Sequence, residues 1–130
     1  MTYIQLKDLF EEQSILNNIN GILSWDMATY MPKKSRSQRI KQIKKIYDYK
    51  KRIFDQIKKN DLIKKAENSN LNGSDKLNLK LMKDRFEYFD SIPYEKIKKK
   101  AALAIECEGV WREAKEKSNF KLVQKNLLDL

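Results

Sequence analysis

Only three glycines and two prolines interrupt this chain of 130 residues, and this scarcity constrains the fold more than any other feature. Glycine and proline are the residues that end helices and form the tight turns of β-proteins. Between them, apolar residues recur three and four positions apart, which places them on one face of a helix. The first such face comprises Leu6, Leu9, Phe10, Leu16, Ile19, Leu23 and Met27. The sequence therefore predicts an all-α fold of long antiparallel helices.

Proline and small polar residues divide the chain into five predicted helices within one segment, 1–130. We expect these helices at roughly 3–31, 36–66, 75–91, 93–117 and 120–130. Pro32 ends the first helix because it has no amide proton to donate, and Pro93 lies in the first turn of the fourth. Ser74 is the expected N-cap of the third helix. Gly21, within the first, costs about 1 kcal/mol relative to alanine, so we expect another backbone to approach it closely.

The chain contains no histidine, which excludes several kinds of catalytic site. Ser-His-Asp and Cys-His nucleophile pairs, an imidazole base and an H-E-x-x-H zinc helix are all ruled out. No glycine-rich phosphate loop is present, and a metal site built from Cys107 and carboxylates alone would be unusual. We therefore predict no catalytic residue and no metal ligand in this chain. One cysteine, no signal peptide and no membrane-length apolar run lead us to expect a cytoplasmic location without membrane contact.

The net charge of +10 is concentrated in one segment. Residues 33–65 hold fourteen basic and three acidic residues, so the segment alone carries +11. Two rows with sevenfold spacing are expected on one face, opposite the isoleucines: Lys44, Lys51, Lys58 and Lys65, and beside them Lys45, Arg52 and Lys59. A solvated lysine-rich surface is the simpler interpretation. The alternative is non-specific binding to nucleic-acid phosphates, with Tyr47 and Tyr49 as stacking groups.

Two sets of carboxylates are candidates for chemistry. Asp26 could act as a general base or a ligand, but one carboxylate cannot divide acid and base roles. We expect it instead to cap a helix or to pair with Arg36 or Arg39. Glu106 and Glu108 flank the single cysteine, and their spacing on a helix places both near the rim.

Two blocks of sequence resemble the carboxypeptidase Taq family of zinc metallocarboxypeptidases. The family reads approximately L-S-W-D-x-x-T-x-M-P and then R-x-x-Q; the corresponding residues here are Leu23, Ser24, Trp25, Asp26, Thr29, Met31, Pro32, Arg39 and Gln42. The second block reads P, a helix with Glu, W-x-x-A-[RK] and N-D-F. It corresponds to Pro93, Glu106, Trp111, Ala114, Lys115, Asn119 and Phe120. This chain departs from the family at Met27, where members often have Gln, at Ser118-Asn119 in place of Asn-Asp, and in its lysine-rich second helix.

The resemblance spans essentially all 130 residues, but only the beginning of the family domain. It implies a mostly helical metallopeptidase that releases C-terminal amino acids from peptides, with zinc held by an H-E-x-x-H helix and a further glutamate. This chain has none of those positions. In the family the first helices form a wall and lid of a deep cleft above the zinc. We therefore expect Trp25 to Pro32 to be a packing corner that fixes the angle of the second helix, and Trp111 to pack as well.

Apolar residues continue to the last position of the chain, at Leu127, Leu128 and Leu130. We therefore expect a chain truncated relative to the family domain: an N-terminal fragment without cofactor or activity of its own. Its expected partner is a second copy or a complementary C-terminal polypeptide, and peptides are substrates only of the complete enzyme. The alternative function is a basic helical interaction module that binds nucleic acid or a protein partner.

Overall fold

The computed structural model describes residues 2–130, and these residues form helices and connecting turns without a strand. The helices are α1 (Thr2–Thr29), the short 3-10 helix η1 (Lys33–Ser35), α2 (Arg36–Lys59), α3 (Leu62–Glu67), α4 (Gly73–Asp90), α5 (Tyr94–Glu116) and α6 (Lys121–Asp129). The predicted all-α class is confirmed. Within the same residues, no helix combines the length and the apolar character needed to cross a bilayer.

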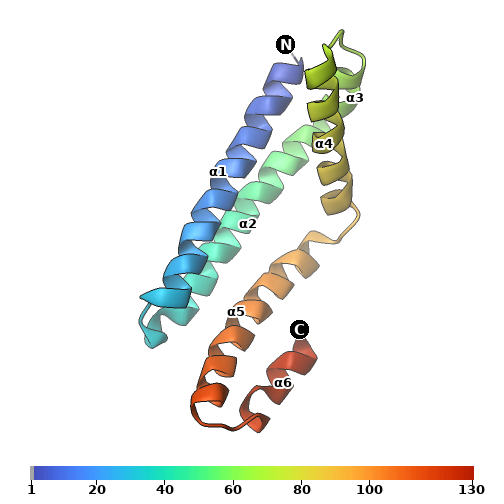
Figure 1. The fold of residues 1–130 in the computed structure, drawn as a ribbon. Helices are drawn as coiled ribbons and strands as arrows, with labels where there is room; N and C mark the ends of the chain where they lie inside the picture. The colour runs from blue at the N-terminus through green and yellow to red at the C-terminus, as the bar shows by residue number, and fades with distance from the viewer. Residues whose placement is uncertain (1) are drawn as a thin grey trace.

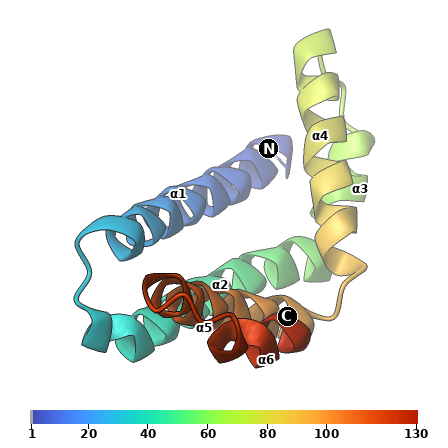
Figure 2. The ribbon, with the colours of Figure 1, turned by 60° about the horizontal axis from the view of Figure 1, so that its bottom comes forward.

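The helices form two layers along α2 (Figures 1 and 2). α1 runs antiparallel to α2, α5 lies along the part of α2 nearer its start, and α6 folds back against α5. α3 and α4 lie at the opposite end of α2, close to the start of α1. The long helices therefore hold the α1–α2 junction and the second half of α5 in the same region of the molecule.

Three clusters of buried side chains hold this arrangement together. The largest joins the start of α1, the end of α2, α3 and α4, with Leu6 and Ile57 at its centre. A second joins α1, α2 and α5 through Leu23, Ile43 and Ile105. A third joins α5 to α6 around Cys107, Ala114 and Val123. Burial of these faces supplies most of the stability of such helices, because isolated helices of this length are marginal in water.

The single helix predicted over 36–66 is wrong, because the chain breaks between α2 and α3. Asp61 adopts the left-handed conformation, with φ of 51°. An unbroken helix turns by about 100° per residue, so Ala66, nine positions after Ile57, would lie on the opposite side from it. The break instead brings Leu62, Ile63 and Ala66 into the same cluster as Ile57. Burial of these three residues is the physical reason for the break.

The other helix boundaries differ from the prediction by one or two residues, and the N-cap of α4 was assigned to the wrong residue. Asn72, not Ser74, is the cap, and its Oδ1 accepts a hydrogen bond of 2.8 Å from the Asp75 amide. Pro93 lies at the N-cap of α5 rather than inside its first turn. Gly21 was expected beside another backbone, but a Cβ at this position would meet no atom within 4 Å. That expectation is also wrong.

The turn from α5 to α6 has the hydrogen bonds of a Schellman motif. The Asn119 amide donates to the Ala114 carbonyl over 2.8 Å, and the Ser118 amide donates to the Lys115 carbonyl over 3.1 Å. Ser118 occupies the left-handed position of this motif, with φ of 49°. This reversal directs α6 back along α5 and buries Val123 against it.

Candidate functional site

One guanidinium group joins α1 to α2 at their junction. Arg39, on the first turn of α2, donates from Nη2 to Asp26 Oδ2 over 2.6 Å and from Nη1 to the Leu23 carbonyl over 2.5 Å. Its Nε donates to Gln42 Oε1 over 2.9 Å. The Arg39 side chain is only 13% exposed, so water screens these charge-assisted bonds little at its end. The pairing of Asp26 with Arg39, one of the two predicted partners, is therefore confirmed.

The chain reverses between α1 and α2 because Met31 and Pro32 end the first helix. The amides of Tyr30 and Met31 both donate to the Asp26 carbonyl over 2.9 Å, which closes the last turn of α1. Pro32 then adopts an extended ψ of 139° and begins η1. Asp26 thus contributes both its backbone carbonyl and its side chain to the junction, and Met31 is half-buried beside it.

Trp25 does not pack into the corner between the helices, so that expectation is wrong. Its side chain is 59% exposed, and its ring contacts the exposed ring of Tyr30 at a centroid distance of 5.6 Å. Trp25 lies on the face of α1 turned away from α2, because the adjacent Asp26 occupies the position that faces Arg39.

The residues of the second block do not converge on one site. Glu106 is exposed, and Phe120 lies at the N-cap of α6 with 65% of its surface exposed. Trp111 is 47% exposed, with Lys115 Nζ 5.3 Å from its ring centroid, so its expected packing role is also wrong within residues 2–130. Pro93 lies at the far end of α5, close to α4.

Neighbours of those residues on α5 do meet the α1–α2 junction. Arg112 Nη1 donates to the Ala28 carbonyl over 3.1 Å, and Lys33 Nζ lies 3.2 Å from Glu116 Oε2. Arg36, at the start of α2, lies against Gly109. A cavity of about 530 Å³ lies between these elements, and Met31 is among its lining residues.

Sequence reasoning did not identify this meeting of the two blocks. The available signal was Gly109, a glycine in the interior of a predicted helix, where its conformational cost needs a packing reason. The cavity is lined by both signs of charge. In it, the hydrogen bond from Lys117 holds the pKa of Glu113 below its usual range. Basic and acidic groups in this mixture can orient a polar chain, but they form no nucleophile–base pair.

The residues described here do not fit a zinc ion. No group of three or more His, Cys, Asp and Glu side chains lies close enough together in residues 2–130 to hold a metal. Cys107 is a buried free thiol in the α5–α6 cluster, and Glu108 is bound by Arg112 over 2.5 Å. Zinc prefers three or four nitrogen and sulfur ligands, which this arrangement does not provide.

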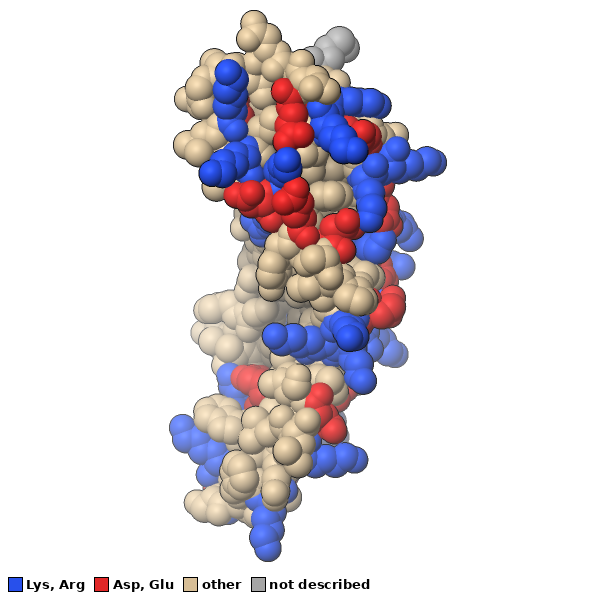
Figure 3. Space-filling view, turned by 90° about the vertical axis from the view of Figure 1, so that its right-hand side faces the viewer, with Lys and Arg blue, Asp and Glu red and all other residues tan. Residues whose placement is uncertain are grey.

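The basic surface of α2 differs from the predicted pair of rows opposite the isoleucines. Lys44 and Lys51 are half-buried at the edge of the apolar face. Lys51 forms an ion pair with Asp55, and Lys58 Nζ lies 2.7 Å from Asp90 Oδ1 on α4. Figure 3 shows Asp and Glu side chains interspersed among Lys and Arg on the face that carries α3 and α4. Part of the positive charge is therefore neutralised within the molecule.

The chain matches the family described as carboxypeptidase Taq (M32) metallopeptidase over residues 5–130. This range includes the Asp26–Arg39 junction and the whole of α5. Comparisons with curated proteins and with solved structures gave no significant match.

Proposed function

Because this chain belongs to the carboxypeptidase Taq (M32) family of metallopeptidases, we propose that it forms a helical wall of a zinc-dependent carboxypeptidase. The observation that carries the proposal is the family match over residues 5–130. The Arg39 network supports a structural role, since it fixes α1 against α2 without leaving a free catalytic carboxylate. In this proposal the chain positions other elements and takes no part in the chemistry.

The zinc ligands and the catalytic carboxylate are then supplied by polypeptide outside these 130 residues. The absence of histidine and the lack of a suitable ligand cluster in residues 2–130 support this division. The chain alone is accordingly proposed to be inactive. We propose a cytoplasmic location, which is consistent with the single free thiol of Cys107.

Exposed apolar surfaces support a partner polypeptide. Ile15, Ile19 and Ile22 follow one another at helical spacing on α1, and all three are exposed. The leucines Leu127, Leu128 and Leu130 are exposed at the other end of the chain. Contiguous apolar surface of this kind is uncommon on stable monomers and usually marks an interface. We propose that a complementary polypeptide with the family's metal-binding helix covers it, with a second copy of this chain as the competing occupant.

The test is complementation. The purified chain is assayed for retained zinc and for release of C-terminal amino acids, alone and after mixing with a polypeptide that carries the H-E-x-x-H segment. We expect activity only in the mixture. Ile22→Glu should abolish complementation, whereas Leu77→Glu, at an equally exposed leucine on α4, should leave it unchanged. Zinc-dependent hydrolysis by the chain alone, or an equal loss in both variants, would contradict the proposal.

One observation favours a second candidate, an interaction module for nucleic acid. Tyr49 is 47% exposed, and its ring lies between Lys45 Nζ at 5.9 Å and Arg52 Cζ at 5.4 Å from its centroid. An exposed ring flanked by cations is a common stacking platform for single-stranded nucleic acid. Fluorescence titration with a single-stranded oligonucleotide tests this role. Affinity that falls steeply with salt and with Tyr49→Ala would favour the module over the peptidase wall.

A further inference from the structure

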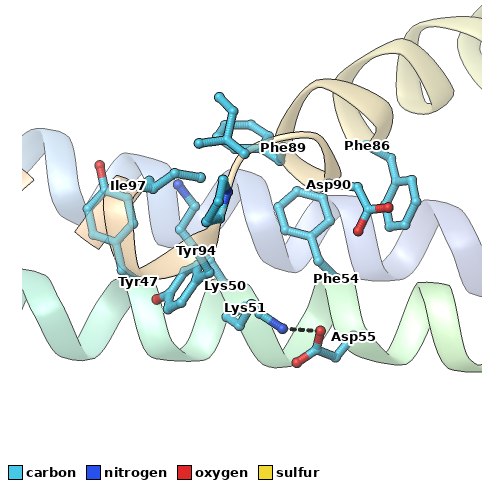
Figure 4. Close-up of a pocket in the computed structure, with 12 residues that line it drawn as sticks. Tyr47, Lys50, Lys51, Phe54, Asp55, Phe86, Phe89, Asp90, Tyr94 and Ile97 are labelled. Carbon is cyan, nitrogen blue, oxygen red and sulfur yellow. Dashed lines mark hydrogen bonds and ion pairs between the residues drawn. The ribbon is translucent and has the colours of Figure 1, made fainter. Parts of the chain in front are cut away.

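A second cavity, of about 210 Å³, lies along the middle of α2 beneath the end of α4 and the start of α5 (Figure 4). Its walls are mainly aromatic, contributed by Tyr47, Phe54, Phe86, Phe89 and Tyr94. Neither motif block contributes to it except through Pro93. The cavity is thus separate from the α1–α2 junction and plays no part in the function proposed above.

The Lys50 side chain extends into this cavity from α2 (Figure 4). Its Nζ lies 4.9 Å from the centroid of the Tyr47 ring and 5.8 Å from that of Phe89, so two aromatic faces flank the ammonium group. Burial lowers the pKa of Lys50, and the charge of Arg85 lowers it further. The ammonium group is therefore partly desolvated in a site that does not compensate its charge.

The acidic residues of the cavity are already paired with other lysines. Asp55 binds Lys51, and Asp90 accepts hydrogen bonds of 2.7 and 2.9 Å from Lys58. Among residues 2–130, Lys50 forms no ion pair. A half-buried cation without a counter-charge is unusual, because desolvation of a charge is costly unless a partner offsets it. The group that would complete this site is an anion with an apolar body.

We propose that this cavity binds a small carboxylate that carries one aromatic ring or a branched aliphatic chain, with the carboxylate beside Lys50 and the apolar body among the aromatic residues. The dimensions agree, since a cavity of about 150 Å³ admits benzene and this one leaves room for a short chain with a carboxylate. The hydrogen bond between Lys50 and the carboxylate is charge-assisted and forms in a partly desolvated site, which strengthens it.

The probe is 3-phenylpropionate, titrated into the full chain and followed by NMR chemical shifts. Two controls separate the contributions: 3-phenylpropan-1-ol has the ring without the charge, and acetate has the charge without the ring. We expect saturable shifts at Tyr47, Phe89 and Lys50 with 3-phenylpropionate, and binding at least about tenfold weaker with either control. Equal binding of the acid and the alcohol, or no saturable binding of the acid, would overturn the proposal.

Substitutions test the role of Lys50 directly. Lys50→Met keeps the apolar stem and removes the charge, so it should weaken 3-phenylpropionate binding about tenfold or more. Lys45→Met removes the same charge from α2 outside the cavity and should leave binding unchanged. Lys50→Arg should retain binding, which guards against a failure of Lys50→Met to fold, and thermal melts of all three check folding. An equal effect of Lys45→Met and Lys50→Met would show only a general effect of charge and would contradict the proposal.

Discussion

The guanidinium of Arg36 occupies the space that a Cβ at residue 109 would need. An ideal Cβ built on Gly109 would lie 1.8 Å from Arg36 Cζ and 2.2 Å from its Nε and Nη2. Gly109 is buried in the interior of α5, and Arg36 begins α2. The two helices therefore approach through an arginine laid against a glycine, and any larger residue at 109 would expel that arginine.

The two helical glycines should respond differently to alanine. Gly21→Ala should raise the free energy of unfolding by about 1 kcal/mol, because alanine has the better helix propensity and the new Cβ meets open space. Gly109→Ala has the same propensity gain but displaces the Arg36 side chain, so its net gain should be smaller or reversed. Urea unfolding of both variants measures the difference. Equal stabilisation by the two substitutions would contradict this account.

A double-mutant cycle isolates the Arg36 contact. In an Arg36→Ala background, no guanidinium remains to be displaced, so Gly109→Ala should recover the full gain of about 1 kcal/mol. Gly21→Ala should give the same gain with or without Arg36, since the two positions share no contact. Additivity at Gly109 as well would show that the close approach carries no energetic coupling.

At the α1–α2 junction, loss of Arg39 should cost more than loss of Trp25. Arg39→Met removes three hydrogen bonds and leaves Asp26 without its cation, at a cost on the order of 1–3 kcal/mol. Trp25→Ala removes an exposed ring and should cost less than about 1 kcal/mol. Denaturant midpoints measure the ranking. A larger loss for Trp25→Ala would restore the packing role first expected of this residue.

Sequence periodicity was sufficient for the all-α class, because a strong apolar stripe and few glycines or prolines leave little else open. It also reduced the partners of Asp26 to two arginines, one turn apart at the start of the next helix. It could not predict the break at Asp61, since the reason for that break is the burial of Ala66 against residues far away in the chain. Exposure of Trp25 was missed for a related reason: a large apolar residue indicates burial, but only the register of the helix shows which neighbour faces inward.

Ser118 holds a backbone conformation that favours glycine. Its φ of 49° is unfavourable for a residue with a Cβ, so Ser118→Gly should raise the free energy of unfolding by roughly 1 kcal/mol. Ser91 is a matched control, because it ends α4 in the right-handed conformation with φ of −73°. Ser91→Gly should be destabilising, since glycine there adds only freedom to the unfolded chain. Thermal melts that shift both variants in the same direction would contradict the assignment.

The ion pair between Asp48 and Lys98 should make stability depend on pH in the acidic range. Lys98 Nζ donates to Asp48 Oδ1 over 2.6 Å, and this hydrogen bond lowers the pKa of Asp48. A lowered folded-state pKa contributes stability above the unfolded value, about 3.9, and loses it as the pH falls through the folded value. Asp48→Asn and Lys98→Met should therefore destabilise the protein at pH 6 and lose most of this effect near pH 2. Urea titrations at both pH values measure it, and a constant difference would contradict the assignment.

Salt should strengthen the association of this chain with itself or with a complementary polypeptide. The exposed isoleucines of α1 and leucines of α6 provide the apolar surface, while the net charge of +10 keeps copies apart. Screening at about 0.5 M salt weakens the repulsion between lysines, whereas the burial of apolar surface does not depend on charge. Nucleic-acid binding has the opposite dependence, because salt reduces the gain from counterion release. Sedimentation at low and high salt, with and without an oligonucleotide, therefore separates the two functions. A chain that stays monomeric at every concentration and binds the oligonucleotide only at low salt would favour the interaction module over the peptidase wall.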